Sequence, residues 1–139
     1  MDPRCEALCE HLARAVVARD FAGAQACLAP WLRATLGPAA LEAQVDAASE
    51  GLAHPPHSWT IGEGLSELSD LRKPDPYSPP TKPLPREITD ANFRGWLSIQ
   101  FAPDPAVHDE QNICYDLWIV AVEHEGAVVA GYLEAWEAS

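Results

Sequence analysis

Asp116 is the carboxylate in this sequence whose neighbours most favour acid–base chemistry. It lies between Tyr115 and Trp118 in a stretch of β-prone residues. Burial among such side chains raises the pKa of an aspartate, and a raised pKa is typical of a catalytic acid or base. The interpretation that we favour is that Asp116 points to solvent or pairs with a loop arginine. The catalytic residues, if any exist, are therefore unknown from the sequence.

Aromatic side chains in the predicted sheet could bind a ligand beside this carboxylate. The predicted ligand-binding residues are Trp59, Asp116, Trp118 and Tyr132. Tyr132 and Glu134 call for the same caution as Asp116, because aromatic residues in strands usually serve packing.

Neither the cysteines nor the histidines predict a metal site. Cys5 and Cys9 have the i, i+4 spacing of one helix face, but no second Cys/His pair at ligand spacing accompanies them. Two prolines form a stiff link between His54 and His57, and no third ligand lies nearby in the sequence. No Ser–His–Asp set stands out as a triad. We expect four free thiols, no metal and no cofactor.

The first third of the chain has the apolar spacing of helices. Asp2 and Pro3 form a helix start, with an N-cap followed by a proline at the first helical position. Apolar residues then recur on one face as far as Arg19. The predicted helices cover residues 3–19, 20–29, 31–36 and 38–51.

Residues 54–86 hold eight of the thirteen prolines, which prevents any long regular element. Ser58–Ile61 is a candidate short strand, and residues 65–71 are either a strand or a single helical turn. Four of the nine basic residues also lie here, so the segment could cross the acidic sheet electrostatically. We expect a long ordered loop or a mobile flap.

The last third alternates apolar and polar residues with the two-residue period of strands. The predicted strands cover residues 93–101, 113–122 and 127–136. The last two form an antiparallel hairpin, and Gly126 supplies the positive φ of its turn. Pairing counted from that turn places Tyr132 on the face of Ile119, and Leu133 on the face of Asp116. Both faces are substantially apolar, so both must be covered, one by the helices and the other by a second copy of the sheet.

Length and charge limit the class of protein. A chain of 139 residues is the size of one domain, with a helical part (1–53), a proline-rich connector (54–92) and a sheet (93–137). The net charge of −12 argues against nucleic acid and anionic membranes as partners. From Gly95 to Ser139 there are eight carboxylates and no Lys or Arg, which would suit a basic protein partner. Because no leader pattern and no membrane-length apolar run occurs, we expect a cytoplasmic protein.

The order of elements resembles the nuclear-transport-factor-2-like (NTF2-like) superfamily, the cystatin-like cone also used by ketosteroid isomerase and the SnoaL polyketide cyclases. The segments that carry the resemblance are the first helix, the patterns Asp20–Ala24 and Leu28–Pro30, and the closing hairpin Trp118–Tyr132. They cover residues 1–53 and 93–137. The resemblance implies an α+β fold in which N-terminal helices pack on a curved antiparallel sheet around a cone-shaped pocket. It also implies a homodimer, since the outer sheet face often forms the interface.

Three functions from different classes remain open. The first is a non-catalytic pocket or dimerisation domain that binds a small apolar ligand between helices and sheet. The second is an acidic interaction protein that masks a basic partner such as a toxin, as an immunity protein does. The third is a small SnoaL-like or isomerase-like enzyme that uses Asp116 with Tyr132 or His11. The isomerases use a carboxylate base with a Tyr and a protonated acid, and this sequence matches no such motif.

Overall fold

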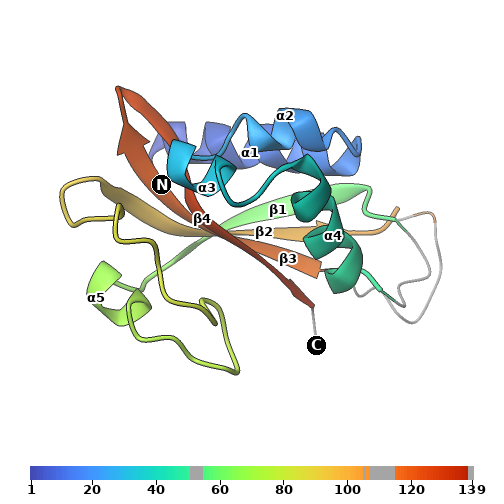
Figure 1. Cartoon of the computed structure of the whole chain (residues 1–139). Coiled ribbons are helices and arrows are strands. Elements are labelled where there is room, and N and C mark those ends of the chain that lie inside the picture. The colour runs from blue at the N-terminus through green and yellow to red at the C-terminus, as the bar shows by residue number, and fades with distance from the viewer. Residues whose placement is uncertain (51–54, 105, 107–114, 138–139) are drawn as a thin grey trace.

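Four helices come first in the chain and lie on one face of a four-stranded antiparallel sheet (Figure 1). The computed structural model describes residues 1–50, 55–104, 106 and 115–137. Its elements are α1 (Pro3–Val17), α2 (Phe21–Gln25), α3 (Pro30–Arg33), α4 (Pro38–Ala48), β1 (Ser58–Gly64), α5 (Leu68–Leu71), β2 (Phe93–Ala102), β3 (Tyr115–His124) and β4 (Ala127–Glu137). The strand order is β1-β2-β3-β4, and the predicted α+β class is confirmed.

The first helix begins as predicted and ends two residues early. The Asp2 carboxylate accepts a hydrogen bond of 2.8 Å from the Arg4 N–H, which satisfies one free donor of the first turn. At the other end Arg19 adopts a φ of 57°, and the Asp20 N–H donates to the Ala15 carbonyl over 2.8 Å. This left-handed cap ends α1 at Val17.

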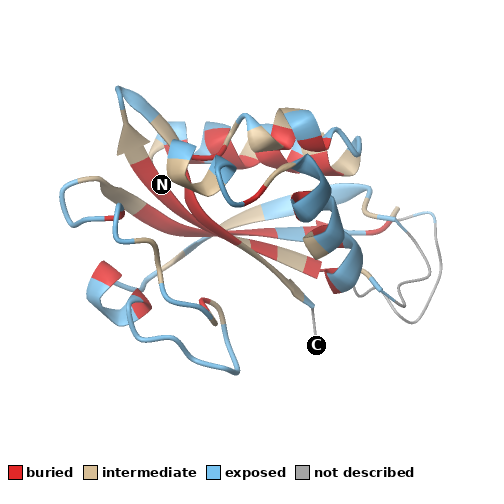
Figure 2. Ribbon diagram, in the orientation of Figure 1, coloured by how far each residue is buried: buried red, intermediate tan, exposed pale blue. Residues whose placement is uncertain are grey.

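The helices cover the inner face of the sheet, which we define as the face toward α1–α4. Leu97, Ile99, Leu117 and Ile119 lie at its centre, each with 0% of its surface exposed. They pack in one cluster with the apolar side of α1, and Figure 2 shows the buried residues along the middle of the sheet. Each such side chain stabilises the fold by about 1.5–3 kcal/mol.

The predicted turn of the closing hairpin is confirmed. Glu125 and Gly126 have positive φ values of 51° and 81°, and His124 pairs with Ala127. Two consecutive positive φ values are those of the type I′ turn, whose twist matches that of the strands. Residues 113 and 114, which the sequence placed at the start of β3, lie outside the described residues.

A β-bulge at Gly131 shifts the register of the hairpin. Ala121 pairs with Ala130, whereas Val120 pairs with Tyr132, so Gly131 is an extra residue on β4. A one-residue shift moves every later side chain to the opposite face. The prediction that placed Tyr132 on the face of Ile119 is therefore wrong.

The corrected register changes what each face carries. Tyr132, Glu134 and Trp136 lie on the outer face together with Asp116 and Trp118. Leu133 and Ala135 lie on the inner face and pack with the core under the helices. Apart from Gly131 itself, no residue in the sequence indicates a bulge at this position.

The proline-rich connector covers part of the outer face (Figure 1). Leu68 and Leu71 of α5, together with Ile88, pack in a second cluster with four sheet residues, which are Trp96, Val120, Val122 and Tyr132. In this part of the face the chain itself provides the cover that we had expected from a second copy. The contact is apolar, so in this part of the face hydrophobic packing holds the connector on the sheet.

Two short elements flank this cover. The candidate strand at Ser58–Ile61 is confirmed. It continues to Gly64 and pairs with β2 along its whole length. Residues 68–71 form the single helical turn, α5. None of the described helices is long and apolar enough to cross a membrane.

We predict that Gly131→Ala lowers the free energy of unfolding by about 1–3 kcal/mol, because a methyl group must fit into a packed core. A Cβ at Gly131 would lie 3.0 and 3.1 Å from the two Cγ atoms of Val122, and 3.3 Å from Ile88 Cδ1. Urea denaturation measures the loss. The control is Gly95→Ala on β2, whose Cβ would meet nothing closer than 3.5 Å. An equal loss in both variants would contradict this account.

Candidate functional site

The structure brings three of the four predicted ligand-binding residues to one face. Asp116, Trp118 and Tyr132 lie on the outer face. Trp59 lies on the inner face opposite Phe101, where it packs against the main core. The predicted set is thus divided by the sheet, and Trp59 serves packing.

Asp116 lies on the outer face, outside the second cluster of described residues. It pairs with Gln100 on β2 and with Trp136 on β4, and its side chain is half-buried. Burial raises the pKa of its carboxyl group. Trp118 lies two residues further along β3 and stacks on Trp96. The two ring centroids are 5.0 Å apart, and the angle between the ring planes is 23°.

Asp116 and Tyr132 are too far apart to act together. Asp116 lies opposite Trp136, four residues along β4 from Tyr132. At about 3.3 Å per residue the two positions are separated by roughly 13 Å along the strand. His11, the other proposed partner of Asp116, lines a groove of about 280 Å³ beside Cys27 and Val128, on the opposite side of the sheet.

Tyr132 and Glu134 instead form a closed hydrogen-bond network with the connector. The Tyr132 hydroxyl donates to Glu134 Oε1 in a short hydrogen bond. Thr81 donates twice to the same carboxylate, from its N–H to Oε1 over 3.0 Å and from Oγ1 to Oε2 over 2.9 Å. Burial, the hydrogen bond to Glu134 and the charge of that carboxylate raise the pKa of Tyr132 far above its ordinary value.

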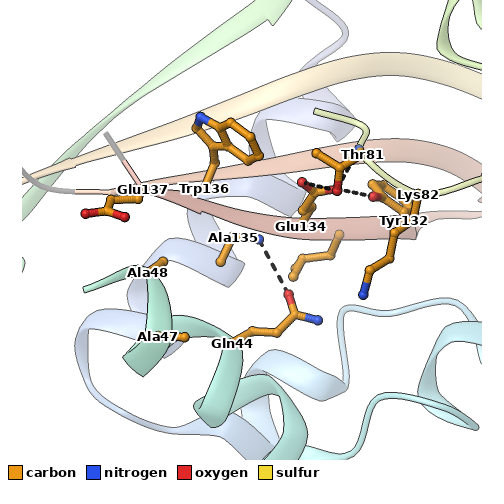
Figure 3. A pocket seen from close by; sticks show the side chains of 11 residues that line it. Gln44, Ala47, Ala48, Thr81, Lys82, Tyr132, Glu134, Ala135, Trp136 and Glu137 are labelled. Atoms are coloured by element: carbon orange, nitrogen blue, oxygen red, sulfur yellow. Dashed lines mark hydrogen bonds between the residues drawn. The ribbon is translucent and has the colours of Figure 1, made fainter. Parts of the chain in front are cut away.

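This network borders a groove of about 390 Å³ along the free edge of β4 (Figure 3). Three segments far apart in the sequence form it: α4 supplies Gln44, Ala47 and Ala48, the connector supplies Thr81 and Lys82, and β4 supplies residues 132–137. We call it the β4 groove. Its lining mixes small apolar side chains, the Tyr132 and Trp136 rings, and a few polar groups.

No periodicity or motif marks Gln44, Thr81 or Lys82 as site residues. Gln44 lies on a helix whose pattern indicates packing alone, and Thr81 lies in a proline-rich stretch without periodicity. Their convergence depends on which strand is at the edge and on where the connector lies. Neither is encoded by local spacing.

The described residues hold no group of three or more His, Cys, Asp or Glu that could bind a metal ion. Cys5 and Cys9 are buried in the main core, and burial raises the pKa of Cys9 to about 12. His57 is exposed, and His54 lies outside the described residues. Cys9 is thus held in its thiol form, which is a poor metal ligand.

We predict that Asp116→Asn leaves the free energy of unfolding at pH 7 unchanged or raises it. A pKa raised in the folded state means that stability declines as pH rises above the ordinary value of 3.8, because the folded chain disfavours the carboxylate. The variant should therefore match the native chain at low pH and equal or exceed it at neutral pH. Urea denaturation across that pH range measures the difference, with exposed Asp90→Asn as control. A destabilised variant at pH 7 would mean that the ionised form makes a favourable contact.

We predict that Glu134→Gln lowers the pKa of Tyr132 toward the ordinary 10.0, because the nearby negative charge is removed. For the native chain, the free energy of unfolding should fall as pH rises above 10.0, since only the folded state resists ionisation. That fall should be smaller in the variant. An NMR titration of the tyrosine ring signals reports the pKa. Glu137→Gln, on the other face of β4, is the charge-matched control and should leave the titration unaltered.

This chain matches no protein-family model, no curated protein and no solved structure with which it was compared. Its function is therefore inferred from the β4 groove and the side chains around it.

Proposed function

We propose that this chain is a non-catalytic binding domain of the NTF2-like type, and that its ligand binds in the β4 groove. The observation that carries the proposal is the convergence of α4, the connector and the β4 edge around one open, partly apolar hollow of about 390 Å³. Such hollows with a few converging polar groups are the usual form of a ligand site. The element order, with helices first and the antiparallel sheet last, supports the NTF2-like assignment and the curved, cone-like sheet that it implies.

The chemistry of the groove favours binding over catalysis. A general acid or base works best with a pKa near the working pH. The pKa of Tyr132 is raised far above neutrality, and its hydroxyl donates a hydrogen bond to Glu134. Glu134 in turn accepts two hydrogen bonds from Thr81, so its oxygens are already occupied. Both groups are thus better suited to hold the connector in place than to exchange protons.

The proposed ligand is partly apolar. Ala47, Ala48, Leu133 and Ala135 offer a smooth wall, while Gln44 and Lys82 offer polar contacts. The sequence predicts a small apolar ligand, and the proposal keeps its apolar part but places it at the edge of β4. That expectation had the ligand between helices and sheet, where the central side chains of the sheet are fully buried.

A homodimer remains part of the proposal. Its support is the group of Trp118, Trp136 and Asp116 on the outer face, whose side chains are half-exposed. Half-exposed aromatic side chains of this kind are enriched at protein interfaces.

We predict that Ala47→Trp abolishes binding of the native ligand, because an indole would fill the β4 groove. Ala47 is exposed and lines the groove, so the larger side chain should be tolerated by the fold. Native mass spectrometry of the protein purified from cells reports both subunit count and bound mass. Ala39→Trp, exposed in the first turn of the same helix and outside the groove, is the control. Retention of the same bound mass by both variants would refute the β4 groove as the site.

A further inference from the structure

Along the second half of β4, the backbone groups at its outer edge have no backbone partner among the described residues. In an antiparallel strand, the N–H and C=O of alternate residues point to the same side. The Ala135 N–H points away from β3, because it donates to Gln44 Oε1 over 3.5 Å. The backbone N–H and C=O groups of Leu133 and Glu137, two residues away on either side, therefore also point away from β3.

The first half of this edge is already paired. The Ala130 N–H donates to the Cys27 carbonyl over 2.9 Å, and the Ala29 N–H donates to the Ala130 carbonyl over 2.8 Å. Trp31 Nε1 donates to the Gly131 carbonyl over 2.9 Å. Leu28 thus forms an isolated parallel bridge with Ala130, and the chain itself occupies this half of the edge.

Within the described residues, the Gln44 side chain is what meets the backbone edge between Leu133 and Glu137 (Figure 3). Its carboxamide oxygen accepts from Ala135 as the carbonyl of a neighbouring strand would. The side chain is half-exposed and its hydrogen bond is long, so it can move aside without leaving a buried group unpaired. Exposed strand edges are the sites at which other chains add strands.

The walls of the β4 groove specify the chemistry of such a strand. Side chains on the inner side would meet Ala47 and Ala48 of α4, where small apolar groups fit. Side chains on the outer side would meet the Trp136 ring, on which a guanidinium or ammonium group can stack.

The charge of the groove also favours a strand that carries basic side chains. Among the described residues that line it, two are carboxylates, Glu134 and Glu137, and Lys82 is basic. The helix α4 and the stretch from Gly95 to Ser139 contain no Lys or Arg, and the whole chain carries a net charge of −12. A basic segment would therefore be attracted to this edge and an acidic one repelled.

We propose that the occupant of the β4 groove is an extended segment of a basic partner protein, which adds as an antiparallel strand to Leu133–Glu137. Small apolar residues of that segment face α4, and alternating Lys or Arg residues face Trp136. Backbone hydrogen bonds supply affinity, and the two walls supply specificity. This inference rests on the proposed function, since it names the class of ligand for the same groove.

The test uses the peptide Arg-Val-Arg-Val-Arg-Val, acetylated and amidated, titrated into the full ¹⁵N-labelled chain. In antiparallel addition the valine amides face β4 and the arginine amides face away. N-methylation of the valine nitrogens should therefore weaken binding at least about tenfold, while N-methylation of the arginine nitrogens should have little effect. The amide signals of Leu133 and Ala135 should shift and gain protection from hydrogen exchange. A peptide with Glu in place of Arg should bind at least about tenfold more weakly.

Equal binding of the two N-methylated peptides would overturn strand addition, and so would the absence of any shift at Leu133 and Ala135. Equal binding of the Glu and Arg peptides would overturn the basic partner. On the protein side, Ala135→Pro removes an outward N–H that β3 does not use, and should abolish binding of the Arg peptide. Should Ala47→Trp still expel a bound small molecule while no peptide binds, the β4 groove stands as a ligand site and strand addition fails. Should the bound mass survive Ala47→Trp, the proposed function itself fails.

Discussion

One extra residue in β4 determines what the outer face of this protein can do. The bulge at Gly131 moves Tyr132, Glu134 and Trp136 across the sheet from where strict alternation would place them. On the outer face Tyr132 closes the second core, and Glu134 holds Thr81. On the inner face the same three side chains would be buried under α4, where a carboxylate would be costly. The connector, the β4 groove and the position of Trp136 all depend on this shift.

The bulge also explains which parts of the molecule were predictable. Helix starts at Asp2 and Asp20, and the turn at Gly126, follow from side chains that act on their own neighbours in the sequence. The faces of β4 were inverted because a bulge has no such local signal, and one inserted residue reverses all that follow it. From Gly95 to Gln100 on β2 the pairing with β3 has no such shift, so alternate residues keep to one face as the two-residue period predicts.

The candidate site was harder to predict than the fold. Asp116 and Trp118 were placed on the correct strand, yet the groove depends on Gln44, Thr81 and the free edge of β4. Whether a strand lies at the edge depends on the strand order of the whole sheet and not on the residues of that strand alone. Trp59 is predicted to bind a ligand together with Asp116, but it lies on β1 opposite Phe101, and its ring packs against the main core.

The position of the connector bears on how the chain folds. β1 ends at Gly64 and its neighbour β2 begins at Phe93, whereas β3 and β4 are joined by a two-residue turn. Contacts between residues close in sequence form first, since closing a long loop costs entropy before any contact repays it. The hairpin should thus form before the connector docks. During that interval the free edge of β4 and the apolar outer face are both uncovered, which makes this late step the one most exposed to self-association.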